Sequence, residues 1–482
     1  RCTMRMPAAD PALLARRDAI AADLGGLCAD PSAVITEADE IRAYESDGLA
    51  AYRQLPLAVV LPATTEEVAA VMRYCHAHGI PVLGRGAGTS LAGGAMPTAD
   101  GVVVGLMRLR EVLEVDLDNR TATVQAGVTN LAITQACEHE DFFYAPDPSS
   151  QLACSIGGNV ANNAGGAHCL KYGVTTNNLL GVKLVSAEGE IVELGGKHLD
   201  AGGLDLLGLV CGSEGQLGLV TEVTVRILAA PAGARPMLLG FDSNEQAGAC
   251  VDAIIASGII PVALEFMDKP AIHAVEAFVG AGYPLDVEAV LICEVEGDDA
   301  EIDTLLARIS AIADHFAPSY RRIAADELQA AAIWKGRKSA FGAVGRICPD
   351  YICIDGTIPT SKLPETLVRI GELSEAYGFR IANIFHAGDG NLHPLILYDA
   401  NNPGEFEKAE ACAADILRLC VDVDGCLSGE HGVGIEKRDL MAYQFEPAEL
   451  ALQRRVKRAF DPDWRLNVGK VFPLEDTGRE AA

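Results

Sequence analysis

The sequence is short of positive charge. Its 482 residues include 38 Lys and Arg against 67 Asp and Glu, which gives a formal net charge of −29. Nucleic-acid binding needs clustered cations that neutralise phosphates, so this balance argues against a nucleic-acid partner. It also disfavours binding to an anionic membrane surface. An anionic small substrate would therefore depend on a local cationic site rather than on the overall field of the protein.

Two further signals are missing. The 14 cysteines are scattered and form no CxxC pair, which argues against an iron–sulfur cluster and favours buried, reduced thiols. No stretch of about 18 uninterrupted apolar residues occurs, so we expect no transmembrane helix and no direct membrane insertion. The opening RCTMRMPAADPALLARRDAI has no long apolar core of a signal peptide. We therefore expect a cytoplasmic protein whose association with a membrane, if any, is indirect and through other proteins.

The length and the hydrophobic content of 49% predict two or three domains. Residues 9–50 have a helical pattern, and from Leu57 short strands and helices alternate between glycine turns. After the Pro/Gly-rich break AAPAGARP near residue 232, the β–α pattern predicts an antiparallel sheet backed by helices. We expect an α+β fold with four parts: a helical segment (1–50), a first domain (51–232), a second domain (233–425) and a C-terminal segment (426–482).

Three glycine-rich stretches indicate a ligand-binding backbone. RGAGTSLAGG (85–94) follows the strand PVLG, and its uncovered N–H groups can face an anion. It is neither a P-loop nor a clean GxGxxG motif, so a pyrophosphate cradle of another type is favoured over a flexible surface loop. SIGGNVANNAGG (155–166) adds amides that suit a flat heterocycle. With GSEGQLGLVTEV (212–223), all three are expected at strand ends, which favours one long ligand crossing the domain.

These stretches carry a family resemblance. VVLPATTEEVAAVMRYCHAHGIPVLGRGAGTSLAGG, PDPSSQLACSIGGNVANNAGG and GSEGQLGLVTEVTVRI resemble the FAD-binding domain of vanillyl-alcohol-oxidase-type (PCMH-type) flavoproteins. WKGRKSAFGAVGRICPDYICIDGTIP, HAGDGNLHPLILYDA and SGEHGVGIEKRDLM extend the resemblance to FAD-linked 2-hydroxy-acid dehydrogenases. That family includes the catalytic subunits of bacterial glycolate oxidases and D-lactate and D-2-hydroxyglutarate dehydrogenases. The resemblance implies a two-subdomain FAD-binding domain, a substrate-binding cap domain and a C-terminal segment that returns to the flavin.

The resemblance also implies the residues that hold FAD. The pyrophosphate cradle would consist of Gly84, Arg85, Gly86, Ala87, Gly88, Thr89, Ser90 and Gly93. The flavin and its ribityl chain would contact Pro146, Ser150, Gly157, Gly158, Asn162 and Gly166. Further cofactor contacts are expected from Val82, Asp147, Asn159, Gly165, Val220 (near the adenine), Glu430 and Asn467. Because RGAGTSLAGG contains no His or Cys for covalent attachment, the FAD should be non-covalent; Val468 replaces a family proline, which predicts a looser turn beside Asn467.

HAGDGNLH (386–393) places two histidines around a glycine turn. If GDGN is the four-residue loop of a hairpin, His386 faces His393 directly, and the two imidazoles can bind one divalent metal. The alternative is a packed histidine pair. The resemblance places a metal on His386, His393 and Glu430, with His431 as the base that takes the substrate hydroxyl proton. These ligand types suit zinc, manganese or iron.

Arg337 of WKGRKSAF matches a family arginine that binds the substrate carboxylate, and the alternative for it is a solvated helix face. The relatives that oxidise larger diacids carry a lysine at the position of Cys353 and an asparagine at that of Leu395. Both departures remove a polar contact to a second carboxylate, so a small 2-hydroxy monocarboxylate, glycolate or D-lactate, is favoured.

The leading hypothesis is therefore FAD-dependent oxidation of a small 2-hydroxy acid to the 2-oxo acid, by hydride transfer to the flavin. The resemblance implies that electrons pass on to a second flavin-type subunit and an iron–sulfur subunit, or to a quinone chain. Three alternatives remain at this point. They are a D-2-hydroxyglutarate-type dehydrogenase, a flavin-free metal hydrolase built on the same histidines, and a non-catalytic scaffold that holds FAD for its partners.

Overall fold

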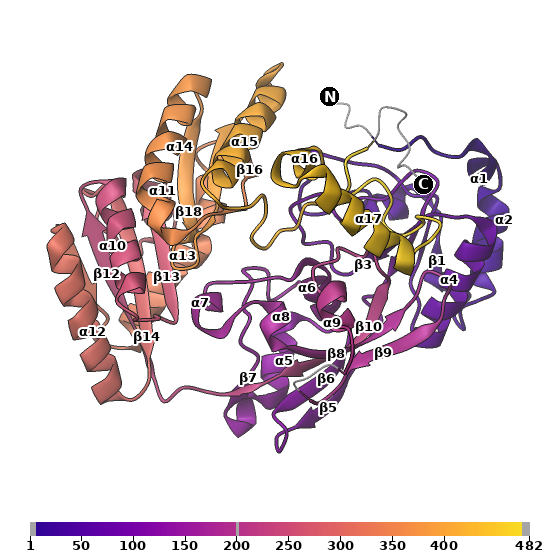
Figure 1. Ribbon diagram of the computed structural model, residues 1–482, viewed down its shortest axis with the longest axis horizontal. Coiled ribbons are helices and arrows are strands. Elements are labelled where there is room, and N and C mark those ends of the chain that lie inside the picture. The colour runs from indigo at the N-terminus through magenta and orange to yellow at the C-terminus, as the bar shows by residue number, and fades with distance from the viewer. Residues whose placement is uncertain (1–5, 199–201, 475–482) are drawn as a thin grey trace. The chain divides into compact units, whose positions relative to one another are not determined.

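The computed structural model describes residues 6–198 and 202–474 (Figure 1). These residues form two compact units. The N-terminal unit contains residues 6–165, 174–229 and 430–474, apart from 199–201, and the central unit contains 166–173 and 230–429. The four-part division expected from the sequence stays a prediction. No helix among the described residues is both long and apolar enough to cross a membrane.

The N-terminal unit has two main sheets. The first is four-stranded, and three adjacent strands in it run parallel to one another. In spatial order it contains β1 (Val34–Ile35), β2 (Ala58–Val60), β4 (Val102–Gly105) and β3 (Val82–Arg85). The second sheet is antiparallel, with β5 (Val112–Asp116), β6 (Thr121–Gln125), β10 (Leu219–Arg226), β8 (Leu179–Val185) and β9 (Ile191–Gly195). A two-stranded ribbon pairs β7 (Phe142–Phe143) with β11 (Leu228–Ala229).

The helices of this unit are mostly short. They are α1 (Pro11–Ala15), α2 (Arg17–Gly25), α3 (Ala38–Ile41), α4 (Thr65–His78), α5 (Asn130–Cys137), α6 (Ile156–Asn162), α8 (Thr175–Asn178), α9 (Leu206–Val210), α16 (Met441–Gln444) and α17 (Pro447–Phe460). The two ends of α4 follow from its sequence. Thr64 caps it by accepting a hydrogen bond from the Glu67 N–H, and Gly79 ends it in the left-handed conformation that a residue with a β-carbon rarely adopts.

The predicted antiparallel sheet backed by helices is confirmed in the central unit. Its strands are β12 (Ala234–Phe241), β13 (Ala263–Asp268), β14 (Ala289–Glu296), β15 (Tyr320–Ile323), β16 (Asp350–Cys353), β17 (Gly356–Thr357), β18 (Arg380–His386), β19 (Asn391–Leu392) and β20 (Pro394–Tyr398). Its helices are α7 (Cys169–Tyr172), α10 (Asn244–Ala256), α11 (Lys269–Val279), α12 (Asp299–Ala313), α13 (Glu327–Val344), α14 (Leu363–Tyr377) and α15 (Glu405–Asp422).

The helices of the central unit lie on both faces of this sheet. Helices α11 and α13 share a core with one face, where they contact Met267, Ile292, Ile384 and Leu395. Helices α10 and α12 pack along β12 and β14, and α14 and α15 along β18 and β20 (Figure 1). Since side chains alternate along a strand, residues two positions from this core set point to the α13 face as well. The polar residues of that face form the site described next.

Candidate active site

Two histidines and a buried acid meet on the α13 face of the central unit. Glu265 of β13 and His386 of β18 are directly opposed in the antiparallel ladder. The Nδ1–H of His386 donates to Glu265 Oε1 at 2.8 Å, and the imidazole rings of His386 and His393 are 5.3 Å apart between centroids, at an interplanar angle of 86°. The two predicted histidines therefore do share one face.

The predicted register of this hairpin is wrong. His386 pairs with Asn391, not with His393, and Asn383 pairs with Pro394, so the same register places His393 opposite Ile384. The loop consists of residues 387–390 because Gly390, at φ +75°, closes the turn one residue earlier than expected. Asn391 thereby enters a strand. The histidines are diagonal neighbours on one face, which still brings their rings together.

Both imidazoles are held in the same tautomer. His393 Nδ1 lies 3.1 Å from the carbonyl oxygen of Ile354, which can only accept, so this nitrogen carries the proton. His386 Nδ1 donates to a carboxylate in the same way. In this tautomer the lone pair of each ring is on Nε2. Metal-binding histidines are typically oriented by just such carboxylate or carbonyl partners, so this donor set fits a divalent cation.

Arg337 of α13 is buried against the same acid. Its Nε donates to Glu265 Oε2 at 2.8 Å, its Nη2 forms an ion pair with the same oxygen at 2.7 Å, and only 8% of its side chain is exposed. Burial raises the pKa of Glu265, but His386 and Arg337 together outweigh that effect and hold the pKa below its usual value. The alternative of a solvated helix face is wrong for Arg337, whose outer guanidinium edge remains for a second anion.

Glu265 is a residue that sequence reasoning missed. A signal was present, because ALEFMD places one carboxylate inside an apolar β-strand pattern. An acid there is costly unless it is paired, so it indicates buried cationic partners. The sequence alone could not identify those partners, which are 72 and 121 positions away along the chain.

Cys353 and Leu395 form a cross-strand pair in the ladder between β16 and β20. Both side chains are buried in the core that also contains Ile384. Leu395 lies two positions after His393, so the alternation of the strand gives them the same face. The two positions that the family resemblance linked to the size of the substrate are thus direct neighbours, and both are apolar.

The loop that leads to Glu430 is anchored to this part of the central unit. The fully buried Asp355 accepts hydrogen bonds from Ser428 Oγ at 2.7 Å and from the Gly429 N–H at 3.2 Å. A β-carbon on Gly429 would lie 2.4 Å from the Asn391 side chain, so this glycine packs tightly beside the histidine hairpin. Glu430 follows Gly429 directly in the chain and is the first residue of the last segment of the N-terminal unit.

In the N-terminal unit, the predicted phosphate-binding loop is half-buried and irregular. None of the backbone N–H groups of residues 87–91 donates a hydrogen bond to another described residue. Backbone N–H groups that are partly shielded from water and have no acceptor are rare. A run of such groups is typical of an anion-binding loop. Arg85 shapes this loop, since its Nη1 donates to the carbonyl oxygens of Ser46 and Ala95 at 2.8 and 3.1 Å. The loop therefore fits a pyrophosphate.

The second glycine stretch lies against the first. A β-carbon on Gly86 would be 2.2 Å from Ser155 Oγ, and Ser155 caps α6 by accepting a hydrogen bond from the Gly158 N–H. The expectation that each glycine stretch lies at a strand end is wrong here. Residues 156–162 form a helix, because Ser155 is a good N-cap and Asn163 adopts the left-handed conformation that ends it.

Loops from four parts of the sequence converge beside this helix. Asn162 Nδ2 donates to the His431 carbonyl oxygen at 2.7 Å and to Ser90 Oγ at 3.4 Å. Glu214, a second acid that sequence reasoning missed, accepts from the N–H groups of Val433 and Gly434, both at 2.7 Å. The carboxylate thus holds the backbone just after His431. Its place inside the quoted stretch GSEGQLG was the available signal.

Asn467 joins the same convergence. Its Nδ2 donates to the carbonyl oxygens of Gly94 and Glu214 at 3.2 and 2.7 Å, and its backbone N–H donates to the Val82 carbonyl oxygen. Its Oδ1 is buried and accepts no hydrogen bond from the described residues. A buried acceptor of this kind suits an N–H donor of a bound ligand.

The other predicted cofactor residues are less informative. Val220 is buried on β10 and packs into the core of the second sheet. The Pro146 carbonyl oxygen accepts from Asn130 Nδ2 at 3.0 Å. Asp147 and Ser150 are half-buried in the same loop, Asn159 is buried on α6, and the break between the units falls between Gly165 and Gly166.

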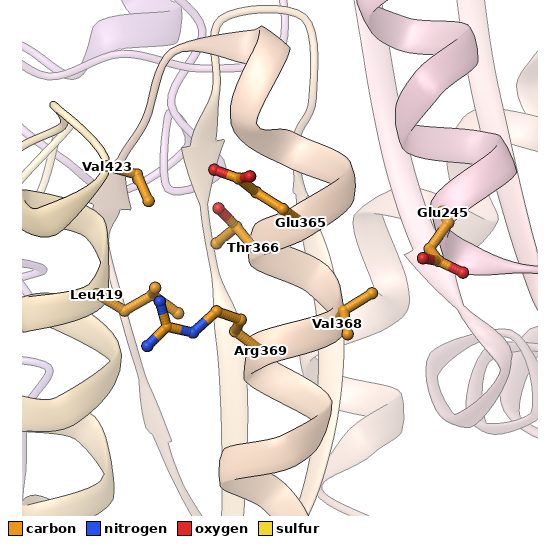
Figure 2. A pocket seen from close by; sticks show the side chains of 7 residues that line it. All are labelled: Glu245, Glu365, Thr366, Val368, Arg369, Leu419 and Val423. Carbon is orange, nitrogen blue, oxygen red and sulfur yellow. The ribbon is translucent and has the colours of Figure 1, made fainter.

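A pocket of about 350 Å³ lies elsewhere on the central unit, around α14 (Figure 2). It is lined by Glu245, Glu365, Thr366, Val368, Arg369, Leu419 and Val423. None of the predicted site residues lines it, so it is not the candidate active site.

Comparison with known proteins agrees with this geometry. Residues 56–195 match the FAD binding domain family, and residues 230–471 match the family described as FAD linked oxidases, C-terminal domain. The chain is 53% identical to glycolate oxidase subunit GlcD of Escherichia coli (strain K12), over 90% of this chain and 87% of that protein. It is 35% identical to a D-lactate dehydrogenase of Archaeoglobus fulgidus, over 91% of this chain and 96% of that protein.

Solved structures agree on the fold. p-Cresol methylhydroxylase with substrate bound superposes with a TM-score of 0.81, at 16% identity, over 97% of this chain and 99% of that one. 4-Ethylphenol oxidase from Gulosibacter chungangensis gives a TM-score of 0.79 at 17% identity, over 97% of this chain and 99% of that one. The predicted α+β fold of PCMH type is confirmed, and so is the family resemblance.

Proposed function

We propose that this chain, which belongs to the FAD-linked oxidases, oxidises a small 2-hydroxy monocarboxylate, glycolate or D-lactate, to the 2-oxo acid. It is an FAD-dependent oxidoreductase, and its relatives include glycolate oxidase subunits and D-lactate dehydrogenases. The observation that carries the substrate class is the cluster of His386, His393 and Arg337 around Glu265. It offers two imidazoles and a guanidinium on one face, which suits a 2-hydroxy carboxylate.

The cation site combines His386 and His393 with Glu430. The support is the tautomer of both imidazoles, and the tether of Gly429, the residue before Glu430, beside the hairpin. A divalent cation held there would lower the pKa of the substrate hydroxyl. Three protein ligands leave a position open for substrate, as in catalytic rather than structural sites. Zinc, manganese and iron all suit these ligands.

Arg337 binds and orients the substrate carboxylate. Glu265 occupies the Nε edge of the guanidinium, which leaves the Nη1 side to donate to an anion. His431 takes the hydroxyl proton, and its backbone is fixed by Asn162 on one side and by Glu214 on the other. FAD, when bound, supplies the acceptor for the hydride that leaves the α-carbon. The products are the 2-oxo acid, a protonated base and a reduced cofactor, so the two electrons and both hydrogens are accounted for.

The apolar pair Cys353 and Leu395 restricts the substrate to a small acid. A second carboxylate near them would lose its hydration without gaining a hydrogen-bond partner, which disfavours 2-hydroxyglutarate by the cost of burying an unpaired charge. The alternative of a D-2-hydroxyglutarate-type enzyme is therefore the less favoured.

Electrons then leave to partner subunits, a second flavin-type subunit and an iron–sulfur subunit. The support is that the chain has no CxxC pair for a cluster of its own, and that relatives are named as subunits of glycolate oxidase. The isolated chain should therefore turn over slowly with oxygen.

Anaerobic mixing with a panel of 2-hydroxy acids tests the proposal. Glycolate and D-lactate should bleach the flavin absorbance, whereas L-lactate and D-2-hydroxyglutarate should do so far more slowly. The same mixing after chelator treatment should be slow until the metal is restored. A colourless, flavin-free preparation that hydrolyses esters or amides would instead support a metal hydrolase, and FAD that no 2-hydroxy acid reduces would support the scaffold alternative.

A further inference from the structure

Glu265 links the two halves of the proposed substrate site. It lies in the middle of β13 between Leu264 and Phe266, and its side chain is 1% exposed. His386 Nδ1 donates to Oε1 at 2.8 Å and lies 3.1 Å from Oε2. Arg337 Nε donates to Oε2 at 2.8 Å, and Arg337 Nη2 forms an ion pair with the same oxygen at 2.7 Å. One carboxylate thus orients both a proposed metal ligand and the proposed carboxylate-binding cation.

The contacts that the Glu265 carboxylate makes with His386 and Arg337 have two consequences. The bond to His386 keeps the proton on Nδ1, which leaves Nε2 as the only lone pair of that ring. The hydrogen bond and the ion pair with Arg337 occupy one edge of the guanidinium and turn the other edge away from the acid. A buried arginine without a counter-charge would be strongly destabilising, so the acid also keeps Arg337 in place.

We propose that Glu265 is a positioning residue that sets the metal-binding tautomer of His386 and the orientation of Arg337 at the same time. The inference rests on the proposed function, because it assumes that His386 binds a cation and that Arg337 binds the substrate carboxylate. Among the described residues, Glu265 is the acid that contacts both side chains, His386 through both of its oxygens and Arg337 through Oε2.

Glu265→Gln separates these roles chemically. A glutamine has one acceptor and one donor end, whereas both partners of Glu265 are donors. If its oxygen accepts from Arg337, its NH₂ group takes the place of Oε1 opposite His386 Nδ1, so the shorter 2.8 Å bond is lost, only the 3.1 Å contact remains, and the tautomer with the proton on Nδ1 is less favoured. If the amide is reversed, its NH₂ group faces the guanidinium. Either arrangement damages one of the two proposed contacts.

Glu294→Gln is the matched control. Glu294 is a buried acid on the neighbouring strand β14, and it also bonds to α13, through Trp334 Nε1 at 2.7 Å. Its other carboxylate oxygen lies 3.1 Å from His168 Nε2, so its hydrogen bonds among the described residues involve neither His386 nor Arg337. The substitution therefore repeats the loss of a buried carboxylate from the same face without touching the site.

The first measurement is the affinity of metal-stripped, FAD-loaded protein for Zn²⁺ alone, by competition with a chromogenic chelator. Glu265→Gln should weaken binding by about 10- to 100-fold, the usual effect of losing the carboxylate partner of a metal-binding histidine, while Glu294→Gln should bind as the wild type does. The second measurement is the KM for glycolate, which should rise in Glu265→Gln and stay unchanged in Glu294→Gln.

A double substitution keeps the test valid if Glu265→Gln fails to fold. Arg337→Met removes the cation but leaves the Glu265–His386 bond, so it should keep wild-type Zn²⁺ affinity and raise only the KM. Glu265→Gln with Arg337→Met removes the buried charge pair together, and it should bind Zn²⁺ 10- to 100-fold more weakly than Arg337→Met. Equal Zn²⁺ affinity in these two variants would overturn the inference, because Glu265 would then merely neutralise Arg337.

The same data separate this inference from the proposed function. Wild-type protein that binds no stoichiometric Zn²⁺, or a His386→Ala variant that binds it unchanged, would refute the proposed metal site itself, and the inference would fall with it. Wild-type binding that depends on His386 but not on Glu265 would refute the inference alone.

Discussion

At the scale of single residues, the chemistry depends on side chains that lie far apart in the sequence and are held by acids. Glu265 holds His386 and Arg337, Asp355 holds the loop before Glu430, and Glu214 holds the loop after His431. In a chain of net charge −29, these three buried acids have a structural task, because each accepts hydrogen bonds from donors distant in the sequence.

His431→Ala tests the proposed base. The expected result is a rate of flavin reduction by glycolate that is about 10²- to 10⁴-fold lower, the usual contribution of a general base. FAD content should not change, because the hydrogen bond from Asn162 goes to the backbone carbonyl of His431, which alanine keeps. Stopped-flow absorbance of the flavin under anaerobic conditions measures the rate, and an unchanged rate would remove His431 from the mechanism.

The Cys353–Leu395 pair offers a change of specificity. Cys353→Lys with Leu395→Asn introduces the residues that the relatives acting on larger diacids carry, at two directly opposed positions. The double variant should gain reduction by D-2-hydroxyglutarate by at least about tenfold relative to glycolate, since one charge-assisted hydrogen bond contributes about 1.5–3 kcal/mol. A ratio of kcat/KM values that stays at the wild-type level would contradict this assignment. Leu397→Asn, on the same strand but farther from His393, is the control.

At the scale of elements, a single turn decides where the histidines lie. Gly390 adopts φ +75°, and a β-carbon there would lie 2.0 Å from the Ile358 carbonyl oxygen. The clash would be with a backbone atom, which cannot move aside without a large cost in free energy. The turn therefore begins at Ala387, and the register that follows puts the two imidazoles on one face as diagonal neighbours.

Gly390→Ala should lower the free energy of unfolding by about 3 kcal/mol or more, from the left-handed conformation and the clash together. Gly280→Ala is the matched control, because Gly280 also has positive φ (+59°) but a β-carbon there would meet nothing within 4 Å. It should cost only about 1–2 kcal/mol. Urea denaturation followed by circular dichroism gives both values, and equal losses would show that the clash has no energetic consequence.

At the scale of the whole molecule, FAD binding and stability should be coupled. The N–H groups of residues 87–91 and the Oδ1 of Asn467 would gain partners on binding, so the ligand should favour the folded state. Free FAD at about 100 times its dissociation constant should add about 2.7 kcal/mol to the free energy of unfolding of the apoprotein. Thermal denaturation with and without FAD measures this, with NAD as the control ligand, and an equal shift with NAD would contradict a specific site.

The cofactor should also be released completely when the protein unfolds. The loop of residues 85–94 contains neither histidine nor cysteine, so it offers no side chain of the types that attach flavins in some relatives. Acid precipitation should leave all of the yellow colour in the supernatant. Flavin that stays with the precipitated protein would show that the attachment is covalent and that another segment provides it.

Much of this protein follows from its sequence. The glycine stretches, the cap at Thr64, the helical and strand periods and the histidine pair are local patterns, and local patterns depend on backbone conformation and on the alternation of side chains. The fold class and family were therefore predictable. The helix at residues 156–162 was not predicted because its glycines are typical of a turn. In the structure these residues are helical, and Gly157 packs closely against Ala126.

Only the tertiary structure decided what holds the site together. That Glu265 pairs with both His386 and Arg337, that Cys353 opposes Leu395, and that Asn391 rather than His393 faces His386 are consequences of strand register. Register depends on contacts between segments distant in sequence and on the one turn that Gly390 permits. Residue types and spacing carry the chemistry of a site, but pairing across a sheet is a property of the packed chain.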